Sequence, residues 1–120
     1  MLNPAALPFS KIRRAAGLVF LSGELPIGET GGMPDGIAAQ TALSLKRMAA
    51  TLAADGLALA DLVQVTVYLS RGEDFAGFNA EYGRHFQAPH PTRTTIVAAP
   101  VLAGALIEIT GVAGIAASVR

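Results

Sequence analysis

Hydrophobic residues recur with a period of two in several short stretches of this chain, and these stretches predict β-strands. The clearest stretch is 62–70, where Val or Leu occupies every second position from 63 to 69. Such alternation is typical of a strand with one buried face. A short apolar run at 18–22 predicts a strand that is buried on both faces or in an interface. The β-branched and apolar segments 92–98 and 105–112 predict two further strands.

Elsewhere the spacing changes to that of a helix. Residues three or four positions apart over 37–55 form one apolar face, which predicts a helix that ends before Gly56. Lys46 and Arg47 lie off this face and are expected to point to solvent. The predicted face consists of Ile37, Thr41, Leu45, Met48 and Leu52.

A second helix is predicted to start at Ser70, because Ser70 and Glu73 have the Ser-x-x-Glu spacing of a capping box. Four aromatic residues follow at intervals of three or four positions, so they share one face of this helix. They are Phe75, Phe78, Tyr82 and Phe86. This spacing favours a place in the hydrophobic core over a binding site.

The order of the predicted elements is strand, helix, strand, helix, strand, strand. This order predicts an α+β fold in which two helices pack on one face of a mixed β-sheet. Residues 26–36 are rich in Gly and Pro and are expected to form a loop. Because the chain has 120 residues and neither a linker nor a repeat, residues 1–120 are expected to form one domain.

Charged residues make up only 15% of the chain and hydrophobic residues 52%, whereas soluble domains average about 25% charged residues. This shortage of charge predicts an apolar surface that another molecule covers. Nine basic residues balance nine acidic ones, which argues against a nucleic-acid partner. The apolar stretch 96–119 is interrupted by Pro100 and Glu108, so no membrane span is expected and a cytoplasmic location is favoured.

The residue types present disfavour several kinds of site. The chain has no Cys, which excludes thiolate nucleophiles, disulfides and cysteine metal sites. Its two histidines, His85 and His90, lack a metal-ligand spacing, so no metal is expected. The Gly-rich segment 28–32 is not followed by Lys-Ser or Lys-Thr, which disfavours a phosphate loop. Ser22 is not in a G-x-S-x-G motif, which disfavours a serine hydrolase.

Two charged residues, Arg93 and Glu108, lie in apolar strand segments. Charged side chains are almost never fully buried unless they are paired. Each therefore either points to solvent, which is the commoner arrangement for a lone charge in a strand, or is held at a site. Most of the charged residues are expected on helices and loops that face solvent, with Arg93 and Glu108 as the exceptions in a cleft.

Several short motifs follow one another along the chain. They are Pro8-Phe9-Ser10, Ser22-Gly23 after 18–21, Thr30-Gly31, Asp61-Leu62-Val63, Thr66-Val67-Tyr68-Leu69, Asp74-Phe75 through Asn79, Tyr82 and Phe86, Pro91-Thr92-Arg93-Thr94, and Ile107-Glu108-Ile109. In this order and spacing the chain resembles the Rid family of reactive-intermediate deaminases, also called the RidA/YjgF family, over nearly its whole length.

The resemblance implies a YjgF-like (chorismate-mutase-like) α+β subunit in a homotrimer with sheets inside, helices outside and active sites between subunits. It implies hydrolysis of enamines and imines, such as 2-aminoacrylate, to 2-keto acids and ammonia without a cofactor. Arg93 would bind the carboxylate of the substrate, and Glu108 would position or activate water. The residues expected to line the site are Phe9, Ser22, Gly23, Asn79 and Thr95. The expected partner is a small-molecule carboxylate, with neither nucleic acid nor membrane.

These residue types suit the implied chemistry. A guanidinium matches a carboxylate with two parallel hydrogen bonds, and a carboxylate such as Glu108 can serve as an acid–base group. Burial would raise the pKa of Glu108, and Arg93 nearby would oppose that rise.

Three positions depart from the family pattern. Phe9 replaces a frequent Tyr, Glu24 follows Ser22-Gly23 in place of Gln, and Thr95 replaces Cys. Phe9 and Glu24 motivate an alternative, a trimeric protein that binds a small carboxylate or regulates without turnover. RNA cleavage is a third reading, which the neutral charge disfavours.

Overall fold

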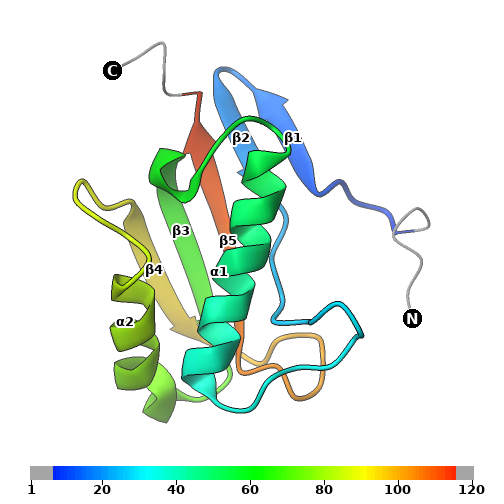
Figure 1. The fold of residues 1–120 in the computed structure, drawn as a ribbon, viewed down its shortest axis with the longest axis vertical. Helices are drawn as coiled ribbons and strands as arrows, with labels where there is room; N and C mark the ends of the chain where they lie inside the picture. The colour runs from blue at the N-terminus through cyan, green and yellow to red at the C-terminus, as the bar shows by residue number, and fades with distance from the viewer. Residues whose placement is uncertain (1–6, 116–120) are drawn as a thin grey trace.

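The computed structural model describes residues 7–115, which form a five-stranded sheet with two helices on one face (Figure 1). The strands are β1 (Ile12–Ala15), β2 (Leu18–Leu21), β3 (Leu62–Leu69), β4 (Thr92–Val97) and β5 (Ile107–Gly114). The helices are α1 (Ile37–Ala53) and α2 (Phe75–Gly83), with single 3₁₀ turns η2 (Leu59–Asp61) and η3 (Gly72–Asp74). The predicted α+β fold with two helices on one face of a mixed sheet is confirmed.

The strands lie in the order β1-β2-β5-β3-β4. Only β3 and β4 run parallel, and α2 forms the crossover between them, as parallel neighbours require. The other neighbours are antiparallel, and the pairing of β3 with β5 is the longest of these. The last strand of the chain therefore lies in the middle of the sheet, while β4 forms one edge and β1 the other.

The strand β1 was not predicted from the sequence. It pairs with β2 in a hairpin whose turn is Ala16-Gly17, with φ of 53° and 77°; positive φ at both turn residues suits the right-handed twist of the strands. Arg13 and Arg14 are exposed on this edge strand. Charges on an edge discourage pairing with other chains. They also interrupt the alternation of hydrophobic and polar residues, so this segment lacks the sequence pattern of a strand.

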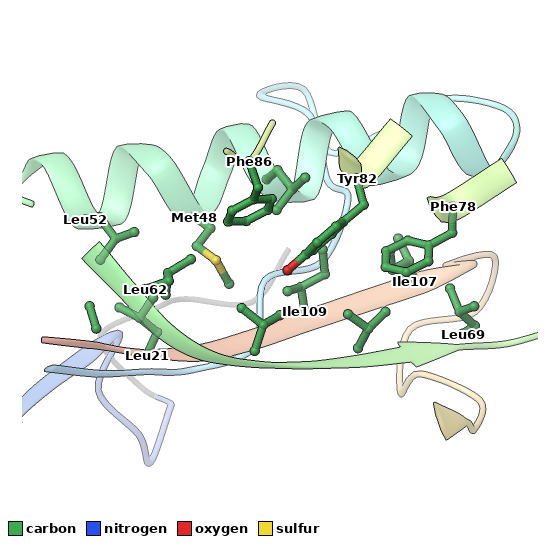
Figure 2. Close-up of a cluster of buried hydrophobic side chains, with 14 of the residues drawn as sticks. Leu21, Met48, Leu52, Leu62, Leu69, Phe78, Tyr82, Phe86, Ile107 and Ile109 are labelled. Carbon is green, nitrogen blue, oxygen red and sulfur yellow. The ribbon is translucent and has the colours of Figure 1, made fainter. Parts of the chain in front are cut away.

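The core lies between the helices and the sheet (Figure 2). Met48 and Leu52 of α1 point toward Leu62 of β3, and Phe78 and Tyr82 of α2 complete the layer (Figure 2). The alternating pattern of β3 predicted Val63 on the buried face, but Val63 is 49% exposed. A register shift between Leu62 and Gln64 reverses the facing of residues at the start of the strand.

The predicted start of the second helix is wrong. No side-chain cap is formed at either η3 or α2, and α2 begins at Phe75 instead of near Ser70. Arg71 bonds Asp74 there, with Nε and Nη2 donating to the two carboxylate oxygens at 3.0 Å each. Phe78, Tyr82 and Phe86 are buried as predicted. Phe75, the first aromatic residue, is instead 46% exposed.

Glu24 is the most buried charged side chain in residues 7–115, with 2% exposure. Its carboxylate accepts hydrogen bonds from Lys11 Nζ at 2.9 Å, Arg47 Nε at 3.3 Å and Thr51 Oγ1 at 2.8 Å. Glu24 is therefore an exception that the sequence did not predict, in addition to Arg93 and Glu108, and the expected outward direction of Arg47 is wrong. This carboxylate joins the segment after β2 to α1.

Candidate active site in two halves

Arg93 extends from β4 toward the helices. It pairs in register with Val65, which is fully buried beneath them. The guanidinium carbon lies 4.8 Å from the ring centre of Tyr82 and 4.9 Å from that of Phe78, distances typical of cation–π contacts. Parallel pairing with β3 and packing against α2 therefore fix the direction of Arg93.

Arg93 keeps hydrogen-bonding capacity for a ligand. Its Nη2 donates to Asn79 Oδ1 at 2.7 Å, and this is the one hydrogen bond of the guanidinium within residues 7–115. A guanidinium has five N–H donors, so most of the fork is available. Asn79 orients the group without neutralising it, since an amide carries no charge.

A pocket of about 450 Å³ opens beside Arg93. Its lining residues are Asn79, Tyr82, Gly83, His90, Pro91 and Arg93. Two residues along β4, Thr95 faces the same side of the sheet. The buried Thr95 Oγ1 has no hydrogen-bond partner within the described part of the chain. We call Asn79, Arg93 and Thr95 the arginine half-site.

Glu108 lies on the opposite face of the sheet. Along β5 the residues at 107, 109, 111 and 113 are buried beneath the helices, and Glu108 belongs to the alternate, half-buried set. Burial raises the pKa of Glu108. Within residues 7–115 its carboxylate makes neither a hydrogen bond nor an ion pair. A half-buried, unpartnered carboxyl of this kind is suited to exchanging protons with a ligand.

Gly23 lies against Glu108. A Cβ added at Gly23 would be 2.9 Å from the carboxyl carbon of Glu108 and closer still to Oε2, so a side chain at position 23 would force this carboxylate to move. Ser22 Oγ donates a hydrogen bond to the Ser10 carbonyl at 2.5 Å, which ties the 22–23 segment to the residue that follows Phe9. Phe9 itself is 57% exposed. We call Ser22, Gly23 and Glu108 the glutamate half-site, and Phe9 adjoins it.

One chain therefore holds its two half-sites on opposite faces of one sheet. This arrangement corrects the expectation that Arg93 would oppose the raised pKa of Glu108, because burial is the cause of the shift and Arg93 is not among its causes. It also shows that Glu24, although next to Gly23 in sequence, points away from the glutamate half-site toward α1.

Phe78 and Tyr82 were predicted only as core residues, but they also hold Arg93. The sequence did contain an indication of this second role, because the predicted site residue Asn79 lies between Phe78 and Tyr82 on the helix that precedes the strand of Arg93. Burial raises the pKa of Tyr82, and Arg93 opposes that rise. In residues 7–115 no group of three or more His, Cys, Asp and Glu could hold a metal ion, and no helix is both long and apolar enough to cross a membrane.

Comparison with known proteins places this geometry in a family. A family model described as endoribonuclease L-PSP matches residues 2–115. The chain belongs to the YjgF/RidA family. Reactive Intermediate Deaminase A, a chloroplastic protein of Arabidopsis thaliana, is 40% identical to this YjgF/RidA chain over 113 residues, which cover 92% of this chain and 60% of the relative.

A RutC family protein from Pyrococcus horikoshii is 35% identical over 108 residues, covering 88% of this chain and 86% of the relative. Among solved structures, Escherichia coli TdcF with bound serine superposes with a TM-score of 0.83 and 31% identity, covering 92% of this chain and 90% of that one. The YjgF/RidA family thus includes proteins named as deaminases as well as the endoribonuclease description of its model.

Proposed function

We propose that this chain is an enamine/imine deaminase, which hydrolyses 2-imino or 2-enamino acids such as 2-aminoacrylate to 2-keto acids and ammonia without a cofactor. The observation that carries the proposal is the Arg93 guanidinium, held by Asn79 and two aromatic rings with most of its donors unused. Such a fork recognises a carboxylate with two parallel hydrogen bonds. Relatives named reactive intermediate deaminases support the same activity.

The reaction needs little beyond one oriented water. An enamine such as 2-aminoacrylate first takes up a proton from solvent at its terminal carbon and becomes the protonated imine. The oxygen of water then forms a bond to the imine carbon, and one proton of this water passes to the ionised Glu108. Glu108 returns that proton to the nitrogen of the tetrahedral intermediate; as the carbon–nitrogen bond breaks and ammonia leaves, the remaining hydroxyl proton passes to Glu108 and the carbonyl forms. Burial raises the pKa of Glu108 and so brings it nearer to neutral pH. A pKa in that direction suits a group that both accepts and donates a proton.

The positions of the half-sites support a site shared between subunits. Since Arg93 and Glu108 lie on opposite faces of one sheet, a ligand that contacts both requires a second copy of the chain. The face away from the helices also carries exposed apolar residues, with Phe20 44% and Ile96 43% exposed. Such surface usually marks an interface. We therefore propose a homotrimer with these faces inside, in which each copy gives one half-site to each neighbour.

Charge favours the deaminase over RNA cleavage, despite the description of the family model. RNA binding requires basic side chains that are free to meet phosphates. Most of those in residues 7–115 are paired instead. Lys11 and Arg47 contact Glu24, Arg14 contacts Asp55, Arg71 contacts Asp74, and Arg84 contacts Glu81.

A second candidate is a small-carboxylate-binding protein without turnover. It is favoured by Phe9, which has no hydroxyl to offer a reacting group, and by the relative TdcF, which was solved with bound serine. Glu24 gives it no support, because that carboxylate faces α1.

Both candidates are tested with an imino acid that an amino-acid oxidase generates in the assay, while 2-keto acid and ammonia release are followed. The wild type should accelerate release, and Arg93→Ala and Arg93→Lys should each abolish the acceleration, because Lys lacks the guanidinium fork. Lys46→Ala, which removes an exposed cation from α1 on the helix side of the sheet, is the control and should retain full rate. An Arg93→Ala variant as fast as wild type would exclude the deaminase proposal. Calorimetric binding of 2-ketobutyrate with no rate above background would favour the carboxylate-binding protein.

A further inference from the structure

Tyr68 lies directly across from Glu108. The antiparallel pairing of β3 with β5 sets Tyr68 opposite Glu108, and both belong to the half-buried set on the face away from the helices. Side chains of directly opposed residues start about 4.5–5.5 Å apart. Tyr68 is therefore the residue of β3 directly opposite Glu108, and both side chains lie on the same face of the sheet.

The hydroxyl of Tyr68 is uncommitted, whereas the other hydroxyls around Glu108 are engaged. Ser22 Oγ donates to the Ser10 carbonyl at 2.5 Å, and Thr110 Oγ1 donates to the Leu21 carbonyl at 2.6 Å. Within residues 7–115 the Tyr68 hydroxyl makes no hydrogen bond. Phe9, which adjoins the glutamate half-site, has no hydroxyl at all. Thr66, diagonal to Glu108 on β3, accepts a hydrogen bond from Gln64 Nε2 at 2.8 Å, so Tyr68 is the hydroxyl directly opposite Glu108 that is not engaged.

We infer that Tyr68 is a positioning residue for Glu108, whose ionised carboxylate accepts a hydrogen bond from the phenol and is thereby aimed at the reacting water. In the structure the carboxylate is turned toward Gly23, so rotation of the Glu108 side chain forms the bond. Tyr68 exchanges no proton with the substrate in this role. The inference rests on the proposed deaminase function of Glu108.

The one other charged side chain on this face of the sheet within residues 7–115 is Arg13 of β1, which is in register with Phe20 and Val112 and therefore lies four residues along β5 and two strands away from Glu108. From the segment after β2, Glu24 faces α1 and is paired with Lys11 and Arg47. From β4, Arg93 lies on the opposite face, and the only further charge proposed to reach Glu108 is Arg93 of a neighbouring copy. Changes in the titration of Glu108 therefore report on Tyr68 when Arg93 is left intact.

The test is Tyr68→Phe, which removes the hydroxyl and keeps the ring. A hydrogen bond to the ionised form lowers a carboxyl pKa, so its loss should raise the Glu108 titration midpoint by about one pH unit. The acid limb of the kcat/KM profile should move upward by the same amount. Loss of aim should lower kcat about ten- to a hundredfold with little change in KM. Thr66→Val, which removes a hydroxyl two positions away on the same strand and face, should match wild type.

The midpoint is read directly by NMR of protein labelled at the glutamate carboxyl carbons, with the Glu108 signal assigned by its loss in Glu108→Gln. This readout needs no turnover, so an inactive wild type would end the deaminase proposal and still leave the Tyr68 contact tested. A raised midpoint in Tyr68→Phe alone supports the inference. An unchanged midpoint overturns it even if kcat falls, because a merely structural role would lower kcat without moving the titration of Glu108.

Discussion

Two inactive variants should restore each other's activity when they assemble together. Arg93→Ala destroys only the arginine half-site, and Glu108→Gln destroys only the glutamate half-site. Because these half-sites lie on opposite faces of one sheet, a site shared between copies can combine an intact half from each variant. In a ring mixed at random from equal amounts, about one quarter of the sites receive both intact halves. The mixture should therefore show about one quarter of the wild-type rate.

The assay mixes equal amounts of the two variants in denaturant and refolds them together, and a different affinity tag on each chain confirms that mixed assemblies form. Deaminase activity is then compared with that of each variant refolded alone. Wild type mixed with the double variant Arg93→Ala/Glu108→Gln is the matched control. A shared site leaves about one quarter of the sites active in that mixture, whereas a site within one chain leaves about half. Mixed assemblies with no more activity than the separate variants would refute the shared site.

Three further predictions concern single residues. Glu24→Gln should lower the free energy of unfolding by about 2–3 kcal/mol. This is below the full cost of breaking a buried pair, because Lys11 is 55% exposed. A free energy of unfolding in urea equal to that of the exposed control Glu29→Gln would contradict this prediction. Gly23→Ala should lower the Glu108 titration midpoint without changing the circular dichroism spectrum, because its methyl displaces the carboxylate from Gly23 and favours its rotation toward Tyr68, whereas Gly32→Ala, which meets nothing within 4 Å, should leave the midpoint unchanged. Since burial raises the pKa of Glu108, its stability contribution is intact below the unfolded carboxyl pKa and is lost as pH rises through the higher folded pKa. Glu108→Gln should then exceed wild-type stability in urea at about pH 8 but not at about pH 3.5, and an equal gain at both would be inconsistent with ionisation as the cause.

Local periodicity predicted both helices and four of the five strands, because the burial of one face imposes that spacing on the sequence. The predictions failed where something other than the spacing of hydrophobic residues determined the local structure. Arg13 and Arg14 conceal β1, since an edge strand tolerates charge. The register shift after Leu62 turns Val63 outward, and no pattern within β3 reveals it. The expected cap by Ser70 does not form, and Arg71 bonds Asp74 at this end of the helix instead.

The candidate site was predictable as a set of residues but not as an arrangement. Whether Arg93 and Glu108 share a face depends on the pairing of each strand with β3, and that pairing joins residues far apart in sequence. The partners of Glu24 come from residues 11, 47 and 51, so its burial was equally invisible. Sequence spacing places residues on elements, and the register of the sheet then decides which of them can meet.

The strand β4 has a consequence for a chain that fails to assemble. It is an edge strand of six residues, Thr-Arg-Thr-Thr-Ile-Val, and its one charge, Arg93, is turned under the helices. Its outer residues Ile96 and Val97 are 43% and 61% exposed. Exposed edge strands of about six residues with high β-propensity and no outward charge are templates for aggregation, whereas Arg13 and Arg14 protect the opposite edge. Variants that block the proposed assembly should therefore aggregate through pairing of exposed β4 strands. In the cell such variants would lose the proposed shared site and become insoluble at the same time.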